Sequence, residues 1–136
     1  MLNFFTRFFY PKEIVVKKGS LQRLKFIKHK NPLLIFSNSS EQNGTVEKIQ
    51  TMIPEIELLK IKAGEPKASY IKDYINKDFK NDIIIAIGGG SVLDTAKLII
   101  AKVLSEENIE DIKPFTISDE NNIKPYLVAI PTTVGS

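Results

Sequence analysis

The sequence of 136 residues contains no cysteine and a single histidine, His29. Without cysteine, the chain has neither a disulfide framework nor a thiol nucleophile, and this composition fits a reducing cytoplasm. One histidine without cysteine also cannot supply the four-ligand set of a zinc site. His29 lies in the cationic run Lys28-His29-Lys30, at the end of a predicted first helix, where a positive charge is favourable. We therefore predict no metal site from these residues.

The chain also lacks an excess of one charge and a long apolar run. It has 19 basic and 16 acidic residues, and the basic ones are scattered along the sequence. Because nucleic-acid binding needs a concentrated basic patch, composition gives no support for a nucleic-acid partner. Residues 1–10 are rich in aromatics but have neither a long apolar core nor a small-residue cleavage site, which argues against a signal peptide or membrane span. We expect a cytoplasmic protein with neither a nucleic acid nor a membrane as its partner.

The sequence does contain a regular alternation of strand-like and helix-like segments, and its apolar fraction of 43% suffices for a single core. Apolar runs and helical spacing predict strands at 13–17, 33–36, 56–61, 83–87 and 126–130, and helices at 20–28, 41–52, 67–79 and 92–104. This alternation is typical of an α/β fold with a doubly wound parallel sheet. Ligands of such sheets bind beyond the carboxyl ends of the strands, which the sequence places at 37–40, 88–91 and 131–136.

The most informative segment joins the fourth predicted strand to the helix after it. Gly88, Gly89 and Gly90 let the backbone turn sharply and leave no Cβ between the main chain and a ligand. Ser91 is predicted to N-cap the helix, whose free N–H groups and positive dipole end then point at the turn. These features predict a cradle for the pyrophosphate of a nucleotide cofactor. A tight structural turn is the alternative, because Leu93 stands where the usual dinucleotide fingerprint has its last glycine.

Asp94 and Lys97 follow in the first turns of the same helix and admit two interpretations. Ser91 and Asp94 have the spacing of a capping box, and Asp94 and Lys97 have that of an exposed ion pair. Alternatively, a side chain of the first turn points back toward a cofactor at the helix N-terminus. Spacing leaves both interpretations open.

Two motifs together resemble the iron-containing (group III) alcohol dehydrogenase family. They are Gly-Gly-Gly-Ser-x-x-Asp-x-x-Lys at 88–97 and Ile-Pro-Thr-Thr-Val-Gly-Ser at 130–136, with a looser match at 9–19. The resemblance implies a Rossmann-like NAD(P)-binding domain, followed by a helical domain that holds Fe²⁺ or Zn²⁺ through an Asp and three His. The metal would polarise the alcohol or aldehyde oxygen while a hydride passes to or from the nicotinamide. We expect residues 1–136 to be the cofactor-binding domain, truncated before the metal-binding domain and inactive alone.

The resemblance also implies roles for particular residues. Residues 88–91 would bind the pyrophosphate. Thr132 and Thr133 would contact the cofactor near its adenine and ribose portions. Asp94 would lie toward the nicotinamide ribose, with Lys97 supporting that region.

Asn38 departs from the pattern of NAD-selective members, which often carry Asp after the second strand to accept from the adenosine ribose hydroxyls. An Asp would repel a 2′-phosphate, whereas a neutral Asn38 would not. The hydroxyls of Ser37, Ser39 and Ser40 could act as further donors. The sequence therefore favours NADP(H) over NAD(H). The alternative is that residues 37–40 form a polar loop that merely caps the next helix.

The leading hypothesis is the N-terminal part of a metal-dependent oxidoreductase acting on a small alcohol or aldehyde. A homodimer of the full-length protein is one open arrangement. One alternative is a glycerol dehydrogenase-like or dehydroquinate synthase-like enzyme, which uses a similar cofactor domain for different chemistry. Another is a non-catalytic nucleotide-binding module, complete at 136 residues. Thr132-Thr133 together with Ser91 favours the alcohol dehydrogenase branch, and an ending inside a motif disfavours the module.

Overall fold

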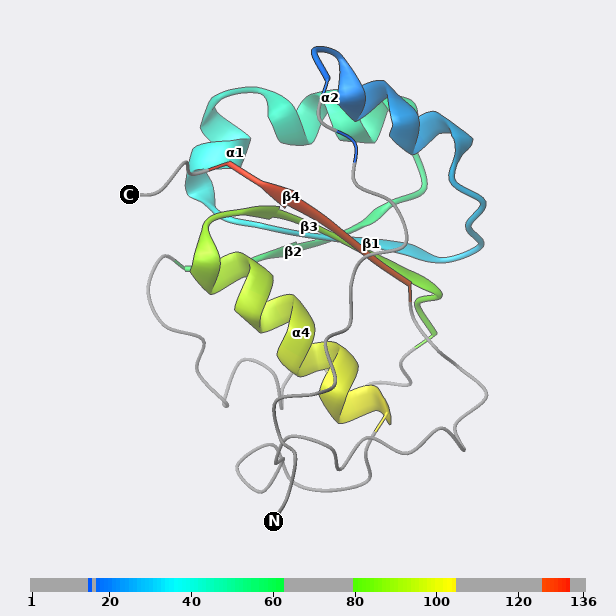
Figure 1. The fold of residues 1–136 in the computed structure, drawn as a ribbon, viewed down its shortest axis with the longest axis vertical. Coiled ribbons are helices and arrows are strands. Elements are labelled where there is room, and N and C mark those ends of the chain that lie inside the picture. The colour runs from blue at the N-terminus through cyan, green and yellow to red at the C-terminus, as the bar shows by residue number, and fades with distance from the viewer. Residues whose placement is uncertain (1–14, 16, 63–79, 105–125, 133–136) are drawn as a thin grey trace.

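The computed structural model describes residues 15, 17–62, 80–104 and 126–132. Strands β1 (Pro32–Phe36), β2 (Glu57–Lys60), β3 (Ile83–Gly88) and β4 (Tyr126–Pro131) form one parallel sheet in the order β2-β1-β3-β4. The helical elements are the 3₁₀ helix η1 (Ser20–Phe26) and the α-helices α1 (Asn38–Gln42), α2 (Thr45–Met52) and α4 (Gly90–Leu104). The predicted α/β class with a parallel sheet is therefore confirmed (Figure 1).

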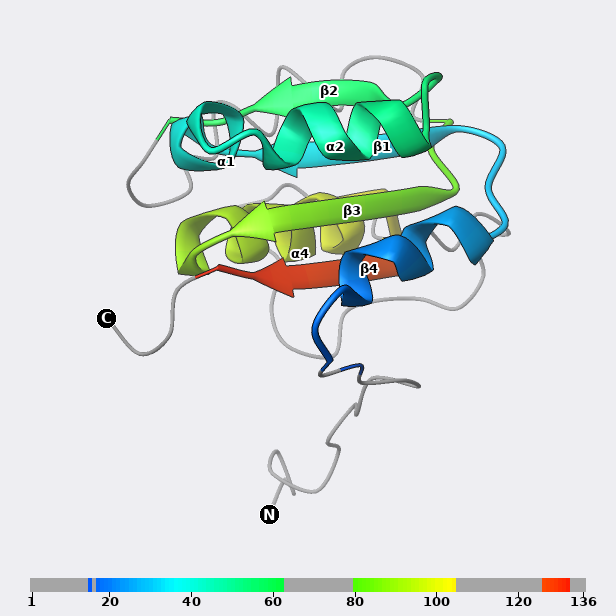
Figure 2. The same cartoon turned by 90° about the horizontal axis from the view of Figure 1, so that it is seen from above.

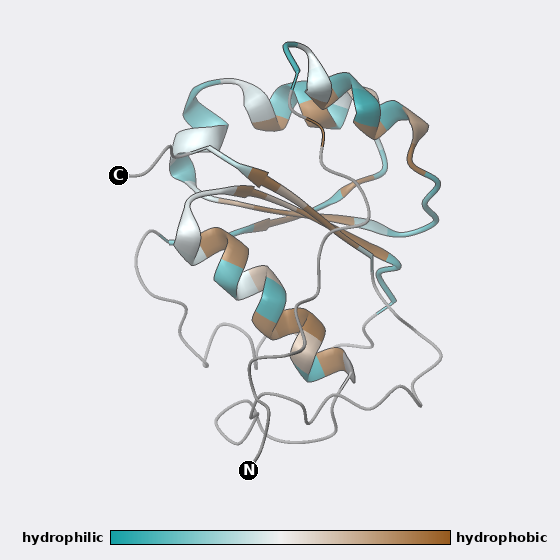
Figure 3. Cartoon of the chain, in the orientation of Figure 1, coloured by the Kyte–Doolittle hydropathy of each residue, from teal (hydrophilic) through white to brown (hydrophobic). Residues whose placement is uncertain are grey.

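Both faces of the sheet are covered, which explains the unbroken apolar runs of its two central strands. Every residue of β1 and β3 is buried, as expected for strands enclosed on both sides. Figures 1 and 2 show η1 and α2 over one face and α4 over the other. In Figure 3, apolar residues fill the strands while polar ones gather on the outer sides of the helices. This is the doubly wound arrangement that the sequence predicts.

Alternate side chains of the central strands build two separate apolar clusters. The first lies against η1 and α2 and includes Leu34, Phe36, Ile83, Ile85, Ile87, Leu24, Val46 and Ile49. The second lies against α4 and includes Leu33, Ile35, Ile84, Ala86, Val92, Ala96 and Ile99. Each large side chain buried in this way contributes about 1.5–3 kcal/mol. Because Val92 belongs to the second cluster, the first turn of α4 is fixed firmly to the sheet.

The helix predicted at 41–52 is in fact two helices. It is divided at Gly44, whose φ of +82° is easily adopted only by glycine. Asn43 Oδ1 accepts hydrogen bonds from the backbone N–H of Thr45 at 3.0 Å and from its hydroxyl at 2.6 Å, so that α2 starts afresh. The first of the two helices begins at Asn38, inside the polar stretch 37–40 that precedes the predicted helix.

The first helix also differs from its prediction at 20–28. It is a 3₁₀ helix that ends at Phe26, so His29 does not lie at a helix terminus as predicted. Instead, His29 Nδ1 lies 3.3 Å from Glu55 Oε1. The predicted helix at 67–79 and most of the predicted strand at 13–17 lie outside the described residues.

Two polar residues before β3 hold the amino edge of the sheet together. The Asp82 carboxylate accepts the backbone N–H of Lys30 at 2.8 Å and that of Asn31 at 2.9 Å, just before β1. The buried Asn81 donates from Nδ2 to the Asn31 carbonyl and to Glu57 Oε2, both at 3.2 Å. These bonds join the starts of β1, β2 and β3.

The contacts of Asp82 predict a loss of stability in acid. Burial raises the pKa of the Asp82 carboxyl, but the N–H groups of Asn31 and Lys30 and the charge of His29 outweigh it and hold the pKa below 3.8. A depressed carboxyl pKa stabilises the fold above the unfolded-state pKa, and this contribution disappears as the pH falls through the folded-state pKa. We expect Asp82→Asn to lower the free energy of unfolding at pH 7 by about 1–2 kcal/mol, measured by urea denaturation.

The control for this prediction is Asp94→Asn, which removes the same charge from an exposed position. We expect its free energy of unfolding to stay within about 0.5 kcal/mol of the unmodified protein. The difference between the Asp82→Asn variant and the unmodified protein should begin to shrink below about pH 4, where the unfolded chain binds a proton at Asp82, and should be lost as the pH falls through the folded-state pKa. Equal effects of the two substitutions at pH 7 would contradict the prediction.

Candidate cofactor-binding site

The segments predicted to bind cofactor leave the sheet side by side at its carboxyl edge. Phe36, the last residue of β1, is paired in register with Ile87, the residue before Gly88. Going outward from this pair, β2 lies beside β1 and β4 beside β3, so the strand order reverses between β1 and β3. Ligands of open α/β sheets bind at such a switch point. Figure 2 shows α1 and the start of α4 at this same edge.

Gly88 makes the turn out of β3 with a backbone and a packing that exclude a side chain. Its φ is +152°, and an added Cβ would lie 2.6 Å from Val92 Cγ2. Its carbonyl accepts the backbone N–H of Thr132 at 3.1 Å, which ties the end of β4 to the turn. The tight turn by itself therefore requires glycine at position 88, and the predicted role of Gly88 in binding pyrophosphate stays a prediction.

The helix after the turn begins at Gly90, and this start differs from the predicted one. The carbonyl of Gly89 accepts the backbone N–H groups of Val92 and Leu93, both at 3.2 Å, so Gly89 occupies the N-cap position. The predicted N-cap role of Ser91 is therefore wrong, because Ser91 already lies in the first turn. Its carbonyl accepts the Thr95 hydroxyl at 2.7 Å.

The first turn of α4 leaves room for an anion. A Cβ added at Gly90 would meet no atom within 4 Å, in contrast to one at Gly88. The first N–H groups of a helix have no intrahelical acceptor, and those of this 15-residue helix carry its positive dipole end. A pyrophosphate fits this combination of donors and space. Thr132 is exposed at the same edge, and Thr133 lies outside the described residues.

Asp94 and Lys97 form the ion pair that one of their interpretations predicts. Asp94 Oδ1 lies 3.8 Å from Lys97 Nζ, and the side chains are 61% and 65% exposed. Such an exposed pair contributes about 0.3–0.5 kcal/mol within a helix. Their predicted position near a nicotinamide ribose stays a prediction.

Ser37, Asn38 and Ser39 form the β1 side of the site. The Ser37 carbonyl accepts the backbone N–H of Ser40 at 3.2 Å, so residues 37–40 do begin a helix. The Ser37 hydroxyl does not cap that helix and lies 3.3 Å from the Ser39 hydroxyl. Asn38 and Ser39 are exposed, whereas Ser40 is buried. The hydroxyl of Ser40 is therefore not among the donors that reach the surface here.

Lys60 completes this side, and the sequence analysis missed it. It ends β2 in register with Phe36, so its side chain starts at the same edge. Lys60 Nζ donates to Asn38 Oδ1 at 3.2 Å and forms an ion pair with the Glu41 carboxylate. The only available signal was the position of Lys60 at the carboxyl end of a strand. The prediction of a strand at 56–61 concealed it, because that prediction placed Lys60 inside the strand.

The sequence matches the family described as iron-containing alcohol dehydrogenase over residues 11–136. The chain belongs to the iron-containing alcohol dehydrogenase family. The family predicted from the two motifs is thus confirmed, and the part of the chain that carries the glycine turn lies inside the match.

The chain is also similar in sequence and structure to individual alcohol dehydrogenases. The chain is 37% identical over 139 residues to an NADPH-dependent butanol dehydrogenase of Clostridium saccharobutylicum, covering 96% of this chain and 36% of that protein. It is 33% identical to an alcohol dehydrogenase of Thermococcus barophilus, covering 90% and 36%. The solved structure of an iron-containing alcohol dehydrogenase from Thermococcus thioreducens is similar with a TM-score of 0.67 and 30% identity, covering 85% and 34%. The chain thus spans about a third of the length of these dehydrogenases.

Among the described residues there is no group of three or more His, Cys, Asp or Glu side chains that could bind a metal ion. Within the same ranges, every helix is too short or too polar to cross a membrane.

Proposed function

We propose that residues 1–136 provide the NAD(P)-binding part of a metal-dependent oxidoreductase. The enzyme would transfer a hydride between the nicotinamide and a small alcohol or aldehyde. Family membership supports the reaction class, and one related protein is named as an NADPH-dependent butanol dehydrogenase. The observation in this structure that supports the proposal is the exposed N-terminus of α4, which lies at the switch point of the sheet and where a Cβ added at Gly90 would meet no atom within 4 Å.

The residues of the chain would bind and orient the cofactor. The backbone at 88–91 would hold the pyrophosphate. Thr132 and Thr133 would lie along the adenosine portion, with Asp94 and Lys97 toward the nicotinamide ribose. When bound, the cofactor would carry the hydride, and an Fe²⁺ or Zn²⁺ ion would polarise the substrate oxygen. We place the ligands of that ion outside residues 1–136, since this sequence has one histidine and no cysteine.

The β1 side of the site supports a preference for NADP(H). Asn38 is exposed and neutral at the position where an acidic residue would repel a 2′-phosphate. The neighbouring Ser37 and Ser39 hydroxyls are donors that suit a phosphate oxygen. The proposal thus includes NADP(H) as the preferred cofactor, a small-molecule partner and a cytoplasmic location.

Direct titration of the protein with NADPH and NADH tests this function. Binding is followed by nicotinamide fluorescence and by calorimetry. We expect both cofactors to bind and NADPH to bind about tenfold more tightly, which corresponds to about 1.4 kcal/mol. A protein that binds neither cofactor at millimolar concentration would refute the proposal, and equal affinities would refute only the preference for NADP(H).

A further inference from the structure

We propose that Lys60 is the residue that recognises the 2′-phosphate of NADP(H), and that Glu41 holds the Lys60 ammonium at the site until the phosphate replaces it. The inference rests on the proposed function, because it concerns the same cofactor. It goes further by naming the charged group that separates the two cofactors. Neither residue belongs to the glycine turn or to the motifs that identify the family.

The first step is the position of Lys60 at the carboxyl edge. β2 lies directly beside β1, and Lys60 pairs in register with Phe36, the residue before Ser37. The backbone N–H of Ile61 donates to the Phe36 carbonyl at 2.8 Å, so the two strands stay joined to their ends. Lys60 therefore begins its side chain beside the polar segment that follows β1.

The second step is the set of donors that converge there. Lys60 Nζ lies 3.2 Å from Asn38 Oδ1, so the amide oxygen of Asn38 is already engaged and its NH₂ group is left to donate. The Ser37 and Ser39 hydroxyls lie within 3.3 Å of each other on the same segment. An ammonium, an amide and two hydroxyls make a donor set for a dianionic phosphate, whose contacts with charged donors are the strongest hydrogen bonds in proteins.

The third step is the carboxylate that opposes this role. Glu41 is paired with Lys60 and would repel a phosphate at the same place. The side chains of Lys60 and Glu41 are 47% and 49% exposed, however, and exposed ion pairs of this kind contribute little. A 2′-phosphate can therefore displace the Glu41 carboxylate from Lys60, whereas the neutral 2′-hydroxyl of NADH offers no charge to do so. Glu41 lowers the affinity for NADPH while it keeps the ammonium near Asn38.

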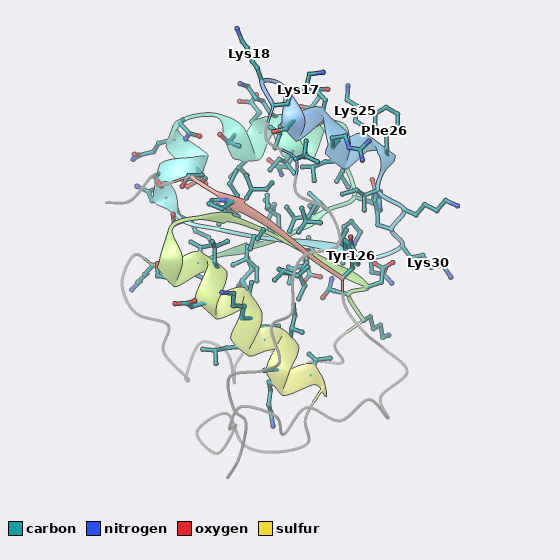
Figure 4. The ribbon with its side chains drawn as sticks, in the orientation of Figure 1. Lys17, Lys18, Lys25, Phe26, Lys30 and Tyr126 are labelled. Carbon is teal, nitrogen blue, oxygen red and sulfur yellow. The ribbon has the colours of Figure 1, made fainter. Side chains whose placement is uncertain are left out.

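The test compares Lys60→Gln, Glu41→Gln and the control Lys30→Gln by titration with NADPH and NADH. Lys30 precedes β1 at the amino edge, and Figure 4 shows its side chain pointing outward there, so its substitution changes the net charge equally at a remote place. We expect Lys60→Gln to weaken NADPH about tenfold and NADH less than about twofold. Glu41→Gln should strengthen NADPH about threefold because it removes the opposing charge. Lys30→Gln should leave both affinities unchanged.

Ionic strength supplies a second measurement. Salt screens the contact between Lys60 and the phosphate, so NADPH should bind more weakly to the unmodified protein in 0.5 M salt than in about 0.05 M salt. This dependence should be smaller in Lys60→Gln. Urea denaturation of each variant shows whether the fold is retained.

The possible failures are distinguishable. If Lys60→Gln weakens NADPH and NADH equally, or changes neither, the assignment of Lys60 is wrong although the proposed function stands. If the unmodified protein binds neither cofactor, the proposed function fails and the assignment fails with it.

Discussion

Gly90→Ala should weaken the binding of NADPH and NADH by at least about tenfold while leaving the fold at least as stable as before. A Cβ at this position meets no protein atom within 4 Å, so the methyl group costs nothing inside the protein. Alanine also has fewer unfolded conformations than glycine, which stabilises the fold by about 0.4–1 kcal/mol where the backbone permits. The same methyl group would occupy the space through which a pyrophosphate approaches the first N–H groups of α4. Each charge-assisted hydrogen bond lost there costs about 1.5–3 kcal/mol.

Two measurements on the Gly90→Ala variant separate binding from stability. Cofactor fluorescence should report the weaker binding, and thermal unfolding should show an unchanged or slightly raised Tm. The matched control is Gly19→Ala. An added Cβ at Gly19 also meets no atom within 4 Å, and Gly19 is the N-cap of η1, away from the carboxyl edge. We expect Gly19→Ala to lower stability slightly through its φ of +80° and to bind cofactor normally. Normal cofactor binding by Gly90→Ala would show that no phosphate approaches this helix end.

Gly88→Ala should have the largest effect on stability, with a loss of about 2–5 kcal/mol. Two causes add here. A backbone at φ +152° is strained for alanine, and its Cβ would lie 2.6 Å from Val92 Cγ2 and 3.0 Å from Val92 Cβ. Val92 is buried in the cluster under α4 and cannot easily move away. Because small domains have about 5–15 kcal/mol of stability, this single methyl group should remove a large share of it.

Urea denaturation of three alanine variants tests whether Gly88→Ala has the largest effect on stability. Gly88→Ala has strain and a clash, Gly19→Ala has strain alone, and Gly90→Ala has neither. The free energy of unfolding should therefore fall most for Gly88, slightly for Gly19 and not at all for Gly90. Adding Val92→Ala to Gly88→Ala should cost less than the sum of the single changes, since it removes the clashing methyl groups. A loss at Gly88 no larger than that at Gly19 would rule out the clash.

The central part of the fold is predictable because its signals are local. β1 and β3 are unbroken apolar runs, and both proved to be buried at every residue. The glycines after β3 mark the turn equally clearly. The start of α4 could not be predicted to the residue, since Gly89 rather than the polar Ser91 accepts the first helical N–H group. Helix starts depend on the backbone conformation of one or two residues, which the side-chain pattern does not fix.

The division between α1 and α2 was hidden for a different reason. The apolar residues of the helix predicted at 41–52 are Val46, Ile49 and Met52, which all follow Gly44, so their spacing says nothing about residues 41–44. The positive φ of Gly44 and the hydrogen bonds of Asn43 to Thr45 divide the helix there. Short polar side chains that bond to the nearby backbone compete with helix formation in this way.

Lys60 shows what a sequence pattern cannot supply about the site. Its contact with Asn38 joins residues 22 positions apart, and it depends on β2 lying beside β1 rather than beside β3. Strand order is a property of the whole sheet, whereas periodicity describes only one segment at a time. The residues that follow a single strand, such as Ser37 and Asn38, are therefore predictable, but their neighbour from the next strand is not.

Because the strand order reverses between β1 and β3, cofactor selection and pyrophosphate binding are proposed to come from two different halves of the chain. The group proposed to choose between cofactors, Lys60 with Asn38, comes from β2 and the segment after β1. The turn proposed to hold the pyrophosphate, common to both cofactors, comes from β3 and α4. Among the described residues, Lys60 contacts Asn38 and Glu41, and neither belongs to that turn. Selectivity and overall affinity should thus be adjustable independently, and the effects of Lys60→Gln and Gly90→Ala on NADPH binding should add in the double variant.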